Sequence, residues 1–217
     1  MLKSDMIEKI EHFFYQFQKY TYKKGELILQ PEHNPIGAYY LSKGYVREYG
    51  ISPSGNEISL HIFFPQSYFP MMWVISDIPN RYYYEALTDI EVYSAPKEDI
   101  LTFLENNSDV LLNLTQRLFL GLDKLTARLE YVSSGKAYDK VVSILLYLAR
   151  HFGEEKGKKI IINYKFTHRD IGSFAGLSRE TTSREWEKLE KKGIIRYEKQ
   201  FIVIEDQQKL LNELSVV

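Results

Sequence analysis

Residues 166–195 constrain the fold most, because two short helical patterns there are separated by a single glycine. Thr167 can cap a first helix, and Asp170 stands where its carboxylate can complete a capping box. Gly176 suits the left-handed backbone that a tight corner between two helices requires. Ser178 can cap a second helix. This order of caps and corner predicts a helix-turn-helix.

The second helix of this motif has two distinct faces. Thr182, Trp186 and Leu189 step by four and three residues, so they predict the inner face. Five polar side chains are then expected to point outward, and they are Arg179, Glu180, Ser183, Arg184 and Glu187. Two β-rich runs follow the glycine that ends the helix and predict a two-stranded wing, at residues 194–197 and 201–204.

The outward face has the chemistry of a major-groove reader. Arginine donates two hydrogen bonds to guanine, and glutamate accepts one from cytosine. We therefore expect Arg179, Glu180 and Arg184 to read bases, with Ser183 beside them. We expect contacts to DNA phosphates from three capping or flanking residues, Ser178, Thr167 and His168. A winged-helix unit that binds protein instead of double-stranded DNA is the alternative interpretation.

The first half of the chain has a different character. Residues 4–20 place apolar side chains at helical spacing. Short β-rich runs alternate with glycine and proline after them and predict an antiparallel sandwich, roll or barrel. The expected strands are 27–29, 38–41, 45–49, 58–64, 82–86 and 91–94.

Residues 107–133 predict one long helix without an internal proline. Leucines along it step by four, three and four residues, and they are Leu118, Leu122, Leu125 and Leu129. A seam of this kind favours a partner helix, and the simplest partner is a second copy of the chain across a two-fold axis. A core helix lying on the β unit is the alternative. The small residues around Gly135 then predict a hinge.

Composition excludes several classes of protein. The chain has no cysteine, so disulfides, thiolate metal sites and cysteine-held clusters are excluded. Its net charge of −1 conceals an acidic part, 1–139, and a basic part, 140–217, which suggests that only the second part meets a polyanion. The charged start and the absence of a long apolar run predict a cytoplasmic protein without membrane contact.

Common catalytic motifs are absent from the sequence, and we expect no enzyme, metal or cofactor. A cupin-like metal enzyme fused to a helix-turn-helix is a distant alternative, because His61 has no neighbouring histidine in its strand. Haem would need an isolated ligand such as His12, His33 or His61, and isolated histidines are more often structural.

The segment 176–195 closely resembles the recognition helix of Crp/Fnr-type transcription regulators, whose signature is S-R-E-T-x-x-R followed by L-x-x-x-G-x-I. The segments 23–29, 37–69 and 85–114 resemble the sensor roll and its exit into the central helix. The resemblance implies a cyclic-nucleotide-binding-domain-like jelly roll, a dimerisation helix and a winged helix-turn-helix, hence an α+β fold. The expected domains are 1–106, 107–135 and 136–217.

The family resemblance also implies function. It implies a homodimer that reads an inverted repeat of TGTGA or TTGAT type, and RNA polymerase as a partner if the protein activates transcription. Carried over to this sequence, the base readers are Arg179, Glu180 and Arg184, and Ser183 stands where the oxygen-sensing branch has serine.

The effector is the least determined part of the resemblance. Cyclic-nucleotide members hold the phosphate with a Gly-Glu-Leu segment and a following Arg-Ser. Here Met71, Met72 and Trp73 stand at the first positions, Asn80 stands at the arginine position, and Arg81 follows one residue late. Cyclic AMP is therefore disfavoured, although a one-residue shift of the loop would return Arg81 to the site. A cyclic-nucleotide-responsive regulator stays as an alternative.

Ten aromatic or methionine side chains lie between residues 63 and 84. They predict either a pocket for a small apolar or aromatic effector or a filled, ligand-independent roll. The candidate pocket consists of Phe69, Met71, Met72, Trp73, Arg81, Tyr83 and Leu125.

Overall fold

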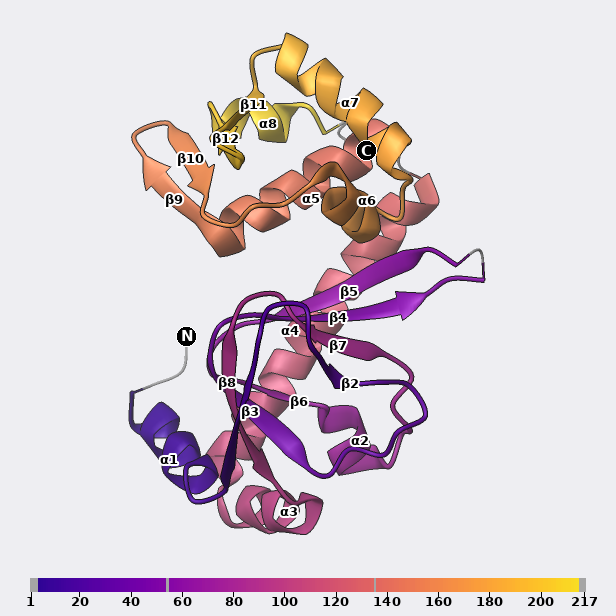
Figure 1. Ribbon diagram of the computed structural model, residues 1–217. Coiled ribbons are helices and arrows are strands. Elements are labelled where there is room, and N and C mark those ends of the chain that lie inside the picture. The colour runs from indigo at the N-terminus through magenta and orange to yellow at the C-terminus, as the bar shows by residue number, and fades with distance from the viewer. Residues whose placement is uncertain (1–3, 54, 135, 215–217) are drawn as a thin grey trace. The chain divides into compact units, whose positions relative to one another are not determined.

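The computed structural model describes residues 4–53, 55–134 and 136–214, without the side chains of residues 4, 124 and 127–134 (Figure 1). It divides into two compact units, Met1–Leu122 and Asp123–Val217. The border lies inside the long helix α4 (Ser108–Ser134), which matches the helix expected at 107–133. Gly135, where we expect a hinge, lies outside the described residues.

The N-terminal unit begins with helix α1 (Ser4–Phe14) and continues as a roll of two antiparallel four-stranded sheets. The first sheet has the order β1-β8-β3-β6, with β1 Gln18–Tyr22, β8 Ile90–Ala95, β3 Ala38–Lys43 and β6 Ser67–Phe69. The second has the order β2-β7-β4-β5, with β2 Leu27–Leu29, β7 Tyr83–Ala86, β4 Val46–Ile51 and β5 Glu57–Phe63. Helices α2 (Met71–Ser76) and α3 (Lys97–Asn106) complete the unit.

The alternation of side chains in β3 explains how this unit builds two cores. Tyr39 and Leu41 point into the roll and pack with side chains of both sheets. Ala38 and Tyr40 point to the opposite face, where α1, α3 and the start of α4 cover the sheet. One strand therefore joins the interior of the roll to the helical layer outside it.

Two expectations for this unit are corrected. The helix expected at 4–20 ends at Phe14, because residues 18–22 pair with β8 as an edge strand. Strand β6 and helix α2 were not expected, since the aromatic and methionine-rich run around them shows no clear period.

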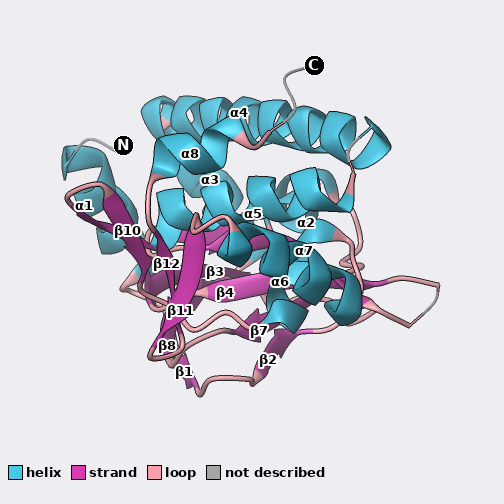
Figure 2. Cartoon of the chain, turned by 90° about the horizontal axis from the view of Figure 1, so that it is seen from above, coloured by secondary structure: helices cyan, strands magenta, loops and turns pink. Residues whose placement is uncertain are grey.

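The C-terminal unit packs helices against one four-stranded antiparallel sheet of order β11-β12-β10-β9 (Figure 2). Its helices are α5 (Ala137–Phe152), α6 (His168–Ala175), α7 (Arg179–Lys191) and α8 (Gln207–Asn212). The strands are β9 Gly153–Lys156, β10 Lys159–Ile162, β11 Ile195–Glu198 and β12 Phe201–Ile204. The wing expected at 194–204 is confirmed as β11 and β12, whereas the hairpin β9–β10 was not expected.

Candidate nucleic-acid interface

The first helix of the motif begins as expected from its caps. The backbone N–H of Asp170 donates to the Thr167 hydroxyl at 3.3 Å, and the backbone N–H of Thr167 donates to the Asp170 carboxylate at 2.7 Å. The helix ends at Gly176, whose φ is 65°. A capping box and a left-handed corner therefore set where α6 starts and stops.

Gly172 is a structural requirement that sequence analysis missed. A Cβ there would lie 2.8 Å from the Leu177 carbonyl oxygen and 2.8 Å from the Thr182 hydroxyl. Only glycine lets α6 approach the corner and α7 this closely. A glycine inside a short helical pattern was the available signal.

Helix α7 presents the expected polar face. Ser178 accepts a hydrogen bond from the backbone N–H of Thr181 at 3.1 Å and so caps the helix. Trp186 and Leu189 are buried with Thr182 on the inner side. The three expected base readers are exposed, and they are Arg179, Glu180 and Arg184. Ser183 is half-buried beside them.

The first turn of α7 combines charges of both signs. A backbone N–H of the first turn and the Ser178 side chain hold the pKa of Glu180 below its usual range. Glu180 is therefore a carboxylate acceptor at neutral pH, and Arg179 beside it is a donor. Free N–H groups at this helix start also suit a phosphate.

His168 packs its ring against two aromatic side chains of the helix-turn-helix unit. Its ring packs 5.0 Å from Trp186 and 5.7 Å from Tyr197, measured between centroids, and its Nε2 is buried without a hydrogen-bond partner. Burial lowers its pKa, so the imidazole is neutral at pH 7. This geometry argues against the phosphate contact that we expected of His168.

The two hydroxyls expected at phosphates are already engaged within the caps. The Thr167 hydroxyl donates to Asp170 at 2.8 Å, and the Ser178 hydroxyl donates to Thr181 at 3.1 Å. Both residues are nevertheless exposed at the helix starts.

The residues expected to line an effector pocket do not form one group. Phe69 lies in the core of the roll, while Met71 and Trp73 pack against the core under α1 and α3. The others are spread over further surfaces: Met72 and Arg81 are exposed, and Tyr83 stacks on Tyr49 with centroids 5.0 Å apart. Leu125 belongs to the other compact unit.

Aromatic rings occupy the interior of the roll. Phe69 lies 4.8 Å from Phe63 and 5.2 Å from Tyr84 between ring centroids. The Tyr84 hydroxyl donates to the buried carboxylate of Glu48 at 2.9 Å. Burial raises the pKa of Glu48. No sequence motif marks this acid, but it stands where strand alternation places an inward side chain.

Asn80, at the position of the family's phosphate-binding arginine, has a structural role. Its side-chain amide donates to the Gln30 carbonyl at 2.9 Å and to the Tyr82 carbonyl at 2.8 Å, and its oxygen accepts from the Tyr82 N–H at 3.1 Å. The buried Asn80 therefore ties two loops together.

Helix α4 carries a row of exposed leucines. Leu118, Leu122 and Leu125 are 58%, 48% and 52% exposed, and Leu111 one heptad before Leu118 is 41% exposed. The side chain of Leu129 lies outside the described residues. An exposed apolar row of this length is typical of an interaction surface.

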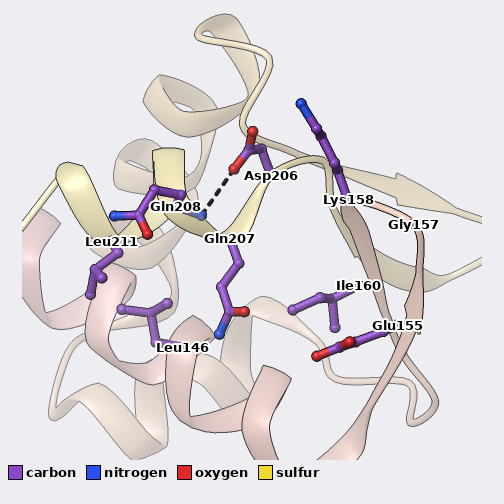
Figure 3. A pocket seen from close by; sticks show the side chains of 9 residues that line it. All are labelled: Leu146, Glu155, Gly157, Lys158, Ile160, Asp206, Gln207, Gln208 and Leu211. Carbon is purple, nitrogen blue, oxygen red and sulfur yellow. Dashed lines mark hydrogen bonds between the residues drawn. The ribbon is translucent and has the colours of Figure 1, made fainter.

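A further pocket of about 640 Å³ lies in the C-terminal unit (Figure 3). Leu146 and Leu211 line it on the side of α5 and α8, and Ile160 and Glu155 line it on the side of the β9–β10 hairpin. None of its lining residues belongs to α6 or α7, so it is separate from the expected interface with bases.

Two family models match the chain in succession. Residues 19–107 match the cyclic nucleotide-binding domain, and residues 139–213 match the Crp-like helix-turn-helix domain. Together they account for about three quarters of the chain.

Curated relatives share this organisation over most of their length. The chain is 25% identical to the global nitrogen regulator of Nostoc sp. over 186 residues, which is 85% of this chain and 83% of the relative. It is also 25% identical to the cyclic AMP receptor protein of Thermus thermophilus over 189 residues, 87% of this chain and 84% of the relative.

Solved structures share the fold. A CRP/FNR-family transcriptional regulator of Thermus thermophilus superposes with a TM-score of 0.73 at 24% identity, covering 91% of this chain and 98% of the other. A CooA mutant from Carboxydothermus hydrogenoformans gives 0.78 at 18% identity, covering 99% and 92%.

A sensor-type roll followed by a helix-turn-helix defines a class of DNA-binding transcription regulators. The chain belongs to the Crp/Fnr family within that class. In the described ranges, no helix is both long and apolar enough to span a bilayer. Within the same ranges, no three His, Asp or Glu side chains gather as a metal site would require.

Proposed function

We propose that the protein is a homodimer that binds an inverted-repeat DNA site of TGTGA or TTGAT type. The observation that carries the proposal is the exposed polar face of α7, where Arg179, Glu180 and Arg184 stand on a helix anchored by buried Trp186. Ser183 lies at the edge of this face. Ser178 and Thr167, at the starts of α7 and α6, are suited to phosphates.

The dimer would form through α4. The exposed apolar row Leu118, Leu122 and Leu125 supports this part of the proposal, and Leu129 continues its spacing. A two-fold axis would set the two recognition helices about 34 Å apart, so that they enter successive major grooves. In this scheme 1–106 is the sensor, 107–135 the dimerisation helix and hinge, and 136–217 the DNA-binding part.

The sensor of this regulator would not respond to cyclic AMP. A cyclic phosphate requires nearby N–H donors and a guanidinium. The Asn80 amide is engaged with backbone groups, and Arg81 is exposed. Mutual packing of Phe63, Phe69 and Tyr84 favours a filled, ligand-independent roll over one that takes an apolar effector.

Cyclic nucleotide control remains the second candidate function. Residues 19–107 match the cyclic nucleotide-binding domain, and the relative from Thermus thermophilus is a cyclic AMP receptor protein. If the protein activates transcription, RNA polymerase would be a further partner. A regulator of this kind would act in the cytoplasm.

Selection from random duplex DNA by the full chain, without added effector, tests the proposal. We expect an inverted repeat whose half-site centres lie about one helical turn apart. Enrichment of such a site without effector would also support the filled roll. Failure to enrich any sequence, both alone and with small metabolites added, would contradict the proposed function.

A further inference from the structure

Helix α7 carries a buried acid between its two faces. Glu185 is 5% exposed, although its neighbours Arg184 and Lys188 have side chains that are 68% and 53% exposed. A buried carboxylate is costly unless cations or donors surround it. The contacts of Glu185 must therefore offset this cost.

Both carboxylate oxygens of Glu185 meet cations of the same helix. Oε1 lies 3.6 Å from Nε of Arg184, and Oε2 accepts a hydrogen bond from Nζ of Lys188. Consecutive helical side chains do not normally face each other, whereas a pair three residues apart does. The Arg184 side chain therefore turns along the helix surface toward Glu185, with the contact at Nε.

The atom that Glu185 contacts determines which donors of Arg184 remain available. A guanidinium has five N–H donors in a planar fork. A carboxylate at Nε leaves the two terminal nitrogens for another acceptor. Those two nitrogens match the O6 and N7 acceptors of guanine in the major groove. A contact that narrows the rotamers of Arg184 before binding lowers the entropy that is lost when the side chain meets a base.

We propose that Glu185 is a positioning residue that aims Arg184 at a base and thereby sets sequence specificity. The inference rests on the proposed base-reading role of Arg184. The Glu185 charge also offsets the charges of Arg184 and Lys188, so it weakens binding to phosphates of any sequence. Glu185 would thus weaken binding to DNA of any sequence and strengthen discrimination between bases.

The variant Glu185→Gln tests this role, with Glu187→Gln as the matched control. Gln has nearly the shape of Glu but carries no charge. Glu187 is exposed on the same helix, so its substitution changes the net charge equally. Dissociation constants of full-length proteins would be measured for the selected inverted repeat, for symmetric single-base variants and for unrelated duplex.

We expect Glu185→Gln to reduce discrimination about five- to tenfold at the base pair that Arg184 reads, and to tighten binding to unrelated duplex about two- to threefold. Glu187→Gln should tighten binding to all duplexes by a similar factor and leave discrimination unchanged. A base-preference profile of Glu185→Gln equal to that of the wild type or of Glu187→Gln would overturn the proposal.

Two further variants separate positioning from folding and from base reading. Glu185→Asp keeps the charge but withdraws the carboxylate by one methylene, so it should lose discrimination without tightening general binding. Adding Glu185→Gln to Arg184→Ala should change discrimination no further, because the two residues act as one unit. If Arg184→Ala itself leaves base preference intact, the base-reading role of Arg184 in the proposed function fails. If it flattens preference while both Glu185 variants do not, only this inference fails.

Discussion

The two compact units differ in how their structure follows from local sequence. In the C-terminal unit, caps, a corner glycine and a short apolar spacing set the ends of α6 and α7 within a residue or two. In the roll, tertiary packing sets the outcome, because strands that are distant in sequence, among them β4, β6 and β7, assemble the interior. Candidate DNA-contacting residues that share one helix can therefore be predicted from their spacing in the sequence. A ligand site formed by several strands cannot.

The dimer variant should have the largest effect, because it removes the connection between two readers. Leu122→Glu with Leu125→Glu places charges on the exposed row of α4 and should yield monomers in sedimentation. Loss of bivalent binding should weaken affinity for the inverted repeat by about 10²–10⁴-fold. Substituting the exposed Leu211 of α8 by Glu is the control. A dimer that persists would contradict the proposed dimer interface on α4.

Large-to-small substitutions in each unit test whether the units are stable independently. Trp186→Ala and Phe69→Ala each remove a buried ring and should cost about 3–5 kcal/mol in their own unit. The chain has two tryptophans, so in Trp186→Ala the remaining fluorescence of Trp73 reports the roll alone. We expect that signal to melt as in the wild type. A matching loss of stability in the roll would show that the units unfold together.

Arg184→Ala tests the proposed base contact in the C-terminal unit. It should cost about 1–3 kcal/mol of binding free energy on the selected site and blur the preference at one base pair per half-site. Competition binding against single-base variants measures both effects. An equal loss on every sequence would mean that Arg184 binds phosphate and reads no base.

The stability of the roll should depend on pH through Glu48. Burial raises the pKa of its carboxyl in the folded state above the unfolded value. Its contribution to stability is therefore present below the unfolded pKa and lost as pH rises through the folded pKa. Glu48→Gln should match the wild type near pH 4 and exceed its melting temperature near pH 8. Equal pH profiles would mean that Glu48 titrates normally.

Of these changes, the addition of cyclic AMP should affect the protein least. We expect no shift of the melting temperature with micromolar cyclic AMP, because Asn80 is engaged with backbone groups and Arg81 is exposed. A saturable rise would follow if the nucleotide bound the folded state alone. Such a rise would restore the cyclic-nucleotide-responsive alternative.

Two expectations met tertiary contacts that the local pattern does not report. Residues 18–20 were expected to end the first helix, yet pairing with β8 places them in strand β1. His168 reads as an exposed polar residue at a helix start, yet its ring packs between Trp186 and Tyr197. In both cases the deciding partner lies distant in sequence, where no local period reports it.

The sequence by itself determined the helix-turn-helix, its caps, the polar face of α7 and the apolar row of α4. Each of these depends on side chains within one or two helical turns, so spacing along the chain is sufficient evidence. Only the tertiary structure decided that Asn80 ties loops together, that aromatic rings fill the roll beside a buried Glu48, and that the buried Glu185 contacts the exposed Arg184. Burial and rotamer choice depend on neighbours from many strands and helices at once, and no linear pattern encodes them.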